Sequence, residues 1–301
     1  MLSTTGQPLQ RVLEQHEAWL NQQAGGVRAD LSGMTLNEAK LDGMTLKRAL
    51  LRGATLLEAD LSGSDLSGAS LERVDFRKAN LSGADLTGAD LSEAQLDMAW
   101  LSGAVLCEAK LRDTSLRKAF LGEARLLDAV IRNSDFSWAK APRASFHQVR
   151  GFEAVFQEAD LTAAVFYHAR LQMCRFRGAS LSNSVFAQAR LDTCDFTNAD
   201  LSEARLPKAD LSRSQFLRAT ISYADLREAT LRGATFRDAV LHGARMGGTD
   251  TFTADFRGAD LKGARELTQE QMSQALTDSY TILPNGTKGP YLKQSGAERP
   301  R

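Results

Sequence analysis

The sequence predicts an all-β solenoid, a four-sided tube in which the chain stacks about twelve coils of twenty residues. The first observation is a five-residue repeat that runs from Leu31 to Leu261 without an insertion. In each copy an apolar residue, mostly Leu, follows a small residue, mostly Ala, by two positions. Such a short fixed period is typical of solenoids, in which each repeat buries its apolar face only against its neighbours.

The spacing of phenylalanine predicts the length of one coil. Within each of two sets, the members differ by multiples of twenty residues, and the two sets are offset from each other by ten. The first set is Phe76, Phe136, Phe156, Phe176, Phe196, Phe216, Phe236 and Phe256, and the second is Phe146, Phe166 and Phe186. A coil of twenty residues places each set in one column, on opposite sides of the tube. Each side is then a short extended segment that pairs with the next coil about 4.8 Å away.

The repeats resemble those of the pentapeptide-repeat family. Copies such as Ala59-Asp60-Leu61-Ser62-Gly63 fit its consensus, Ala-(Asp/Asn)-Leu-X-X, and the resemblance covers about residues 24–265. It implies a right-handed quadrilateral parallel β-helix. It says little about activity, because this family hosts many roles.

The open ends of a solenoid expose unpaired strand edge, so we expect short helical caps at both ends. Residues 1–23 form the predicted N-terminal capping helix, with an amphipathic segment over 8–23 that begins at Pro8. Its apolar stripe consists of Leu9, Val12, Leu13, His16 and Leu20.

Residues 266–284 are predicted to form a C-terminal cap helix and a return segment, after the solenoid of 24–265. Thr268 and Gln271 fit a capping box, and the helix is expected to run to about Leu276. Residues 280–283 are then expected to fold back on the last coil. The Gly, Pro and charge of 285–301 predict a flexible tail.

The repeat is irregular at 141–152 and again at 246–252. Gly151 and Thr251 replace core leucines in the same column, and each is followed by Phe. A local bulge or bend is expected there. The alternative is sequence drift that a stable solenoid tolerates.

Composition excludes several classes of function. Lys plus Arg and Asp plus Glu are both 37, so no global field draws the chain to nucleic acid or to an anionic membrane. No apolar run is long enough to span a bilayer, and the first residues do not read as a secretory signal. Cytoplasmic residence is expected. Three unevenly spaced cysteines are not a disulfide framework, and Cys174 and Cys194 are expected to be buried thiols.

No pattern in the chain predicts catalysis, so we expect no enzyme, no catalytic residue, no cofactor and no metal. His147 and His168 lie near Tyr167, but two histidines without carboxylate or thiolate support make a poor zinc site. The Asp that recurs before Leu is interpreted as turn chemistry. No phosphate-binding loop, nucleophile elbow or His-Glu metal motif is present.

Mapping outward residues onto the coil predicts a protein-binding patch. Trp100 and Phe120 share one outward column, and Val105 lies close to it. A second column holds Leu127, His147 and Tyr167. An apolar patch with Trp and Tyr favours a protein contact, and the alternative is scattered apolar drift.

A second candidate surface is a ladder of arginines. Arg150, Arg170 and Arg190 are stacked in one column, with Arg175 and Arg177 on the next side. Like charges on neighbouring coils repel unless an anion or an acidic partner lies across them. The alternative is a solvated basic face.

The function predicted from these features is that of a non-catalytic rigid scaffold for protein–protein interaction in a bacterium. Its partner is another protein, unidentified, and a homodimer is left open. The segment from His16 to Leu31 resembles bacterial pentapeptide-repeat proteins, including some associated with type VI secretion. One alternative is a DNA mimic that binds DNA gyrase or topoisomerase, as quinolone-resistance members do, although those are acidic. The other is a secreted effector.

Overall fold

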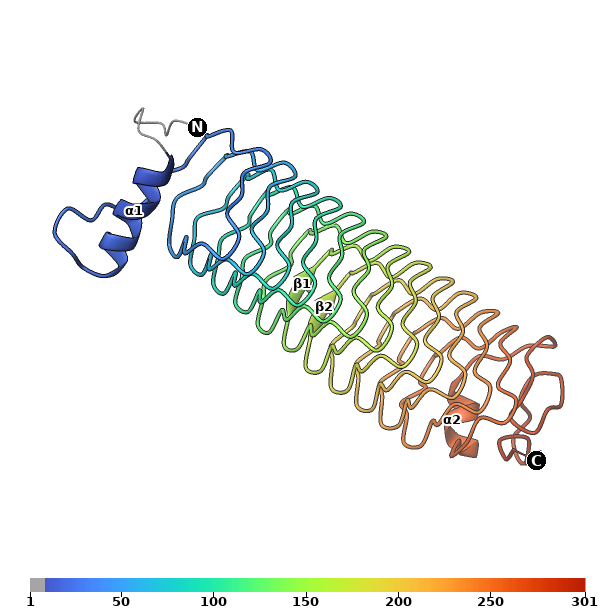
Figure 1. Ribbon diagram of the computed structural model, residues 1–301. Helices are drawn as coiled ribbons and strands as arrows, with labels where there is room; N and C mark the ends of the chain where they lie inside the picture. Colours follow the sequence, from blue (N-terminus) through green and yellow to red (C-terminus); the bar gives the residue numbers. More distant parts are fainter. Residues whose placement is uncertain (1–8, 301) are drawn as a thin grey trace. The chain divides into compact units, whose positions relative to one another are not determined.

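A computed structural model describes residues 9–300 of the chain. The chain divides into two compact units, Met1–Ser145 and Phe146–Arg301. The first unit contains helix α1 (Leu9–Leu20), and the second contains strands β1 (Arg150–Phe152) and β2 (Arg170–Gln172) and helix α2 (Gln269–Gln274) (Figure 1). The boundary between the units falls inside the irregular segment 141–152.

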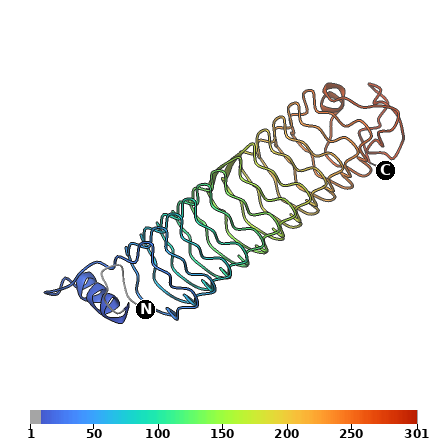
Figure 2. The ribbon, with the colours of Figure 1, turned by 90° about the horizontal axis from the view of Figure 1, so that it is seen from above.

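Within each unit, residues pair in parallel with the residue twenty positions further along the chain. Thr55 pairs with Asp75 in the first unit, and Asp195 pairs with Gln215 in the second. Successive coils therefore lie side by side, as Figures 1 and 2 show for each unit. The predicted coil length of twenty residues is confirmed within both units.

Each coil changes direction through tight turns between its sides. The Ala59 N–H donates to the Leu56 carbonyl at 3.1 Å, and Glu58 between them has φ of 57°. This is the geometry of a type II turn, whose third residue must adopt a left-handed conformation. Gly63 takes the corresponding place in the next turn with φ of 63°. Glycine is suited to this place because it has no Cβ to clash.

The recurrent Asp contributes to these turns, as predicted. Asp60 Oδ1 accepts hydrogen bonds from the Ser62 N–H at 3.0 Å and from the Ser62 hydroxyl at 2.7 Å. These bonds hold the pKa of the Asp60 carboxyl below its ordinary value. The repeated Asp is therefore used within its own repeat.

The core of the second unit is built from stacked phenylalanine rings. Phe156, Phe176 and Phe196 lie over one another with ring centroids 4.8 Å apart. Phe166, from the second set, meets Phe156 edge-on at 6.1 Å and 90°. All these rings are fully buried, so the predicted two-column arrangement is confirmed. In the first unit, leucine fills most of the equivalent positions.

Helix α1 contacts the first coils through a buried histidine. His16 is fully buried, and its Nδ1 accepts a hydrogen bond from the Ala29 N–H at 3.1 Å. Figure 2 shows the helix lying across the N-terminal edge of these coils. The helix ends at Leu20, three residues before the predicted limit of 23. Pro8, its predicted first residue, lies outside the described residues, as does the rest of 1–8.

Helix α2 begins as predicted and ends early. The Thr268 hydroxyl accepts from the Gln271 N–H at 3.2 Å, and Gln271 Oε1 accepts from the Thr268 N–H at 2.7 Å. This is the predicted capping box. The helix ends at Gln274 instead of near Leu276, because Leu276 pairs in parallel with Asp255 as an additional rung.

After α2 the chain adds a further rung to the last coil and then continues into the C-terminal segment. Ile282 pairs in parallel with Asp260. Beyond it, the Tyr291 hydroxyl donates to Glu298 at 3.1 Å, and Ala297 is buried. The flexibility expected for 285–301 stays a prediction.

The expected bulge is not present at 150–152. Strand β1 pairs with β2 without a change of register, Gly151 lying opposite Leu171. The predicted bulge is therefore wrong for this pair of coils, where the chain forms a three-residue strand instead of a single bridge, and the alternative prediction of a bend is not tested by this pairing. At the other irregularity, the Thr251 hydroxyl is buried and donates to the Gln271 carbonyl at 2.7 Å. A hydroxyl replaces Leu there because α2 supplies it with an acceptor.

Candidate protein-interaction surfaces

The first unit exposes a stacked aromatic pair. Trp100 and Phe120 are paired across neighbouring coils, and their rings stack with centroids 4.6 Å apart and an interplanar angle of 21°. Trp100 is 52% exposed. On the next coil, Lys140 Nζ lies 5.5 Å from the centroid of the Phe120 ring. The two rings are in register because the coil repeat is twenty.

Two further apolar side chains lie along the neighbouring corner. Met98 and Trp138 are 42% and 41% exposed, and both occupy the left-handed position of a turn. The Met98 N–H donates to the Arg117 carbonyl, and the Lys118 N–H donates to the Ser137 carbonyl, so these turns are stacked. The Arg117 guanidinium lies 5.1 Å from the Trp138 ring centroid. We define the aromatic patch as Met98, Trp100, Phe120 and Trp138.

Sequence reasoning missed Met98 and Trp138. The signal was available, because each turn position is outward and lies two residues before the outward column of Trp100 and Phe120. A hydrophobic residue at this turn position is therefore exposed, as Trp100 is in its own column.

A shallow hollow adjoins the patch. It has a volume of about 340 Å³, and Trp100 forms one wall. Glu58 and Lys78 line it and form an ion pair at 2.8 Å. Asn80 donates to Asp60 at 3.0 Å on the same surface. The Trp100 indole therefore lies beside polar side chains that are already paired with one another.

The remaining predicted patch residues fall in two places. Val105 and Leu127 belong to the first unit, and Leu127 is exposed. His147 and Tyr167 belong to the second unit, where their ring centroids are 5.2 Å apart. The Trp100–Phe120 pair therefore belongs to the first unit, and the His147–Tyr167 pair belongs to the second.

The arginine ladder lies in the second unit. Arg150 pairs with Arg170 between β1 and β2, and Arg170 is bridged to Arg190. All three side chains are exposed. Arg175 is also exposed, whereas Arg177 forms an ion pair with Asp195 at 2.9 Å. The structure brings the three ladder residues onto neighbouring coils, and their role as an anion or acidic-partner site stays a prediction.

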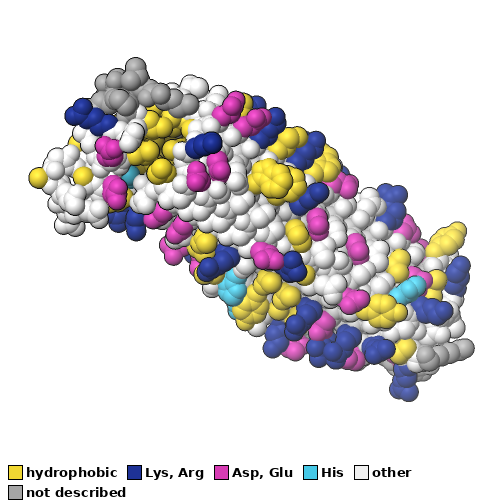
Figure 3. Space-filling model, viewed as in Figure 1, with side chains coloured by type: hydrophobic (Ala, Val, Ile, Leu, Met, Phe, Trp, Pro, Cys, Tyr) yellow, Lys and Arg dark blue, Asp and Glu magenta, His cyan; other side chains and the backbone are white. Residues whose placement is uncertain are grey.

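The histidines and carboxylates of the described residues do not form a metal-binding cluster. Among residues 9–300, no three His, Cys, Asp or Glu side chains converge as a metal site would require. His168 meets the Tyr167 ring at 4.1 Å. In the space-filling view, Lys and Arg side chains alternate with Asp and Glu over the face shown (Figure 3). Because basic and acidic side chains are intermixed, this face has no large area of a single charge.

The cysteines are free thiols. Cys174 and Cys194 are fully buried, and the Cys194 thiol donates to the Leu171 carbonyl at 3.0 Å. Burial raises the pKa of Cys194 well above its ordinary value, which disfavours the reactive thiolate. The two residues act as larger substitutes for core alanine.

Across the described part of the chain, no helix has the length and apolarity needed to cross a bilayer.

Comparison with family models identifies pentapeptide repeats in eight copies. The matched residues are 29–68, 69–106, 109–148, 152–183, 174–213, 194–233 and 214–250, more than half of the chain. The chain belongs to the pentapeptide-repeat family. Pentapeptide-repeat proteins fold as right-handed quadrilateral β-helices, and they are generally non-enzymatic.

Solved pentapeptide-repeat structures resemble parts or most of the chain. HetL from the cyanobacterium Nostoc sp. strain PCC 7120, a protein involved in heterocyst differentiation regulation, is 26% identical, with 96% of this chain and 100% of HetL covered and a TM-score of 0.38. A thylakoid-lumen protein of Arabidopsis thaliana is 35% identical over 30% of this chain and 66% of its own, with a TM-score of 0.21. Full-length QnrB1, a plasmid-mediated fluoroquinolone resistance protein, is 18% identical over 84% of this chain and 93% of its own, with a TM-score of 0.23. These scores are too low to carry a functional inference. No curated protein matches the chain.

Proposed function

We propose that this pentapeptide-repeat protein is a non-catalytic scaffold that binds another protein through the aromatic patch. The observation that carries the proposal is the stacked pair of the exposed Trp100 and the half-buried Phe120. A repeat that places polar residues outward in most coils exposes Met98, Trp100 and Trp138 here. Trp is strongly enriched among the residues that dominate binding energy at protein interfaces.

The patch is held in position before a partner arrives. The Trp100 N–H donates to the Ala79 carbonyl at 2.9 Å, and the Phe120 N–H donates to the Ala99 carbonyl at 2.9 Å. Backbone that is already ordered loses little entropy on binding, so more of the contact energy appears as affinity. The ion pair of Glu58 and Lys78 and the Lys140 ammonium lie beside the rings, where they supply a polar rim.

The test is partner capture with a double variant. Affinity purification from source cells with Trp100→Asp/Phe120→Asp is expected to lose the partner that the unchanged protein captures. Both side chains point outward, so circular dichroism and the unfolding midpoint are expected to stay close to those of the parent. Tyr280→Asp is the matched control, because Tyr280 is an exposed aromatic residue outside the patch. Equal capture by the parent and the double variant would contradict the proposal.

Bacterial origin, cytoplasmic residence and a link to type VI secretion belong to the same proposal. Bacterial origin and the link to type VI secretion are supported by the resemblance of the segment from His16 to Leu31 to bacterial family members, and cytoplasmic residence stays a prediction. The alternative function is that of a secreted effector, and no feature of the described residues supports it.

A gyrase-binding DNA mimic is disfavoured by the arginine ladder. A duplex mimic must present rows of negative charge, and Arg150, Arg170 and Arg190 present a row of positive charge. A gyrase supercoiling assay distinguishes the two functions. The scaffold proposal predicts no effect of the protein on supercoiling or on quinolone inhibition.

A further inference from the structure

On more than one side of the first coil, backbone hydrogen-bonding groups have no partner among residues 9–300. In an inner coil, such as that of Asp65, the bridging residue directs both groups towards the preceding coil. The Asp65 N–H donates to the Met44 carbonyl at 3.0 Å, and the Asp65 carbonyl accepts from the Leu46 N–H at 2.7 Å. Thr45 occupies the same position one coil earlier and has no coil before it. Its N–H and carbonyl make no hydrogen bond to any residue between 9 and 300.

Helix α1 covers the first coil unevenly. Met34 and Ala39, on two sides of this coil, are only 6% and 8% exposed. Met44 occupies the equivalent inward position on a third side and is 43% exposed. The uncovered side of the coil is therefore the one that also carries the open backbone of Thr45.

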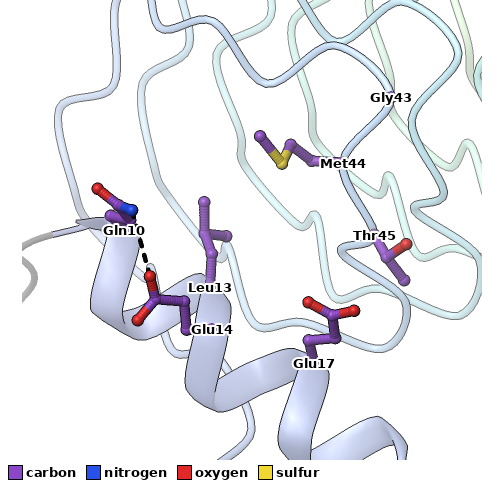
Figure 4. A pocket seen from close by; sticks show the side chains of 7 residues that line it. All are labelled: Gln10, Leu13, Glu14, Glu17, Gly43, Met44 and Thr45. Atoms are coloured by element: carbon purple, nitrogen blue, oxygen red, sulfur yellow. Dashed lines mark hydrogen bonds between the residues drawn. The ribbon is translucent and has the colours of Figure 1, made fainter.

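A slot separates α1 from this side. Figure 4 shows Leu13 and Glu17 of the helix facing Met44 and Thr45 across it, whereas the Glu14 side chain is turned towards Gln10. The slot has a volume of about 340 Å³, and a neighbouring hollow of about 490 Å³ shares Glu17 and Thr45 with it. Together they offer room for a few residues of extended chain.

The chemistry of the slot is apolar on its floor and negative on the helix side. Leu13 and Met44 supply the floor. Glu14 accepts a hydrogen bond from Gln10 at 3.2 Å, and neither Glu14 nor Glu17 forms an ion pair with a described residue. Lys47 and Arg48 line the adjoining hollow, whereas no Lys or Arg of the described residues lines the slot itself. The carboxylates and the apolar floor of the slot are therefore complementary to an apolar side chain followed by Lys or Arg.

We propose that this slot binds an extended segment of a partner protein, which adds to the open edge at Thr45. The segment donates to and accepts from the Thr45 backbone, places an apolar side chain on Leu13 and Met44, and sets a Lys or Arg beside Glu14 and Glu17. Strand addition to an unpaired edge is a recurrent mode of peptide recognition, in which main-chain bonds give affinity and side-chain pockets give specificity. The proposal is independent of the aromatic patch.

The probe is a synthetic heptapeptide, Ser-Thr-Lys-Leu-Lys-Thr-Ser, acetylated and amidated. Its binding to the full-length protein is followed by backbone amide chemical shifts in a titration to about 1 mM, a range that detects weak complexes. Saturable shifts at Thr45 and Met44 are expected. A second peptide with Glu in place of both Lys is expected to bind at least about tenfold more weakly, because one lost charge contact is worth about that factor.

Two proline variants separate edge pairing from general damage. Thr45→Pro removes the open N–H of the slot, and Thr35→Pro removes the N–H of the same residue type on another side of the first coil. Thr35, like Thr45, donates its N–H to no described residue, so both variants are expected to fold. Thr45→Pro is expected to weaken the binding of the probe about tenfold, and Thr35→Pro is expected to leave its affinity unchanged. Glu17→Lys, which leaves the edge intact, is expected to weaken it as well.

Three outcomes would overturn the proposal. The probe fails to shift Thr45 in the parent protein, or Thr45→Pro binds it as tightly as Thr35→Pro does. In the third, the probe binds only after residues 1–8 are deleted, which would assign the slot to the chain's own first segment.

Discussion

The C-terminal edge of the second unit and the N-terminal edge of the first are finished in different ways. At the C-terminal edge, Leu276 and Ile282 pair with Asp255 and Asp260, so extended chain continues the ladder. At the N-terminal edge, α1 lies against the coil and Thr45 pairs only with Asp65, on its inner side. The first arrangement closes the edge, and the second leaves part of it open.

The difference follows from what each kind of element offers. The backbone groups inside a helix are already bonded to one another, so a helix buries apolar surface but adds no rung to a ladder. His16 partly compensates, because its side chain accepts the Ala29 N–H. Extended segments satisfy the edge directly. Where a solenoid ends in a helix, unpaired backbone remains as a potential binding edge.

Of the changes that distinguish the two edges, Gln271→Ala at the C-terminal edge is expected to lower the free energy of unfolding most. The buried Gln271 amide donates to the Thr249 carbonyl at 2.9 Å and to the Met246 carbonyl at 3.0 Å. Its loss leaves the Thr249 carbonyl buried without this donor, and we expect a cost of about 2–3 kcal/mol. Urea unfolding measures it. Gln274→Ala, on the exposed side of α2, is the control and is expected to change stability by less than about 0.5 kcal/mol.

A slightly smaller loss of stability is expected when Asp255, at the same edge, is protonated at acid pH. Hydrogen bonds from Arg257 and Arg237 lower the pKa of the nearly buried Asp255 carboxyl from 3.8 to about 2. The unfolded chain binds this proton more readily, so the contribution is complete above pH 3.8 and is lost as pH falls towards 2. We expect about 2 kcal/mol to disappear over that window. Asp255→Asn should flatten this part of the pH profile, and an unchanged profile would exclude Asp255 as its source.

The smallest effect is expected at the N-terminal edge, from protonation of His16. Burial lowers the pKa of His16, with the Arg28 charge acting in the same direction and a hydrogen bond to the Lys47 backbone opposing both. Protonation would also place a proton on Nδ1, which accepts the Ala29 N–H. Because the folded pKa lies below the ordinary 6.5, stability is level above that pH and falls below it.

Hydrogen exchange at the Ala29 amide measures this loss. We expect protection to decrease as the pH is lowered from 7 to 5, after correction for intrinsic exchange rates. His16→Gln, which keeps an acceptor but does not titrate in this range, should abolish the pH dependence. Persistence of the dependence in that variant would show that another group causes it.

Much of the fold is predictable because the repeat is strict. Phe156 and Phe176 differ by twenty residues, and a coil of that length places their rings one above the other. Asp60 and Gly63 identify the turns by their own chemistry. Thr268 and Gln271 identify the start of α2. In each case the information lies within one repeat or one motif.

Other features depend on neighbours that a linear pattern does not reveal. Leu276 looks helical by its apolar spacing, but it leaves α2 because an unpaired coil edge offers it a rung. Thr251 looks like damage to the core until α2 supplies its acceptor. Trp138 was missed because a turn position is usually polar. The division at Ser145 and Phe146 falls where the sequence is irregular, but the sequence predicted a local bulge or bend there and not a boundary.

The proposed interaction is tested most directly by site-specific photocrosslinking in source cells. A photoreactive phenylalanine replaces Trp100 in one protein and the exposed Tyr223 of the second unit in another. We expect a discrete protein adduct from position 100 that disappears when Phe120→Asp is added, and no such adduct from position 223. Absence of an adduct at position 100, or the same adduct from both positions, would contradict the proposed interaction.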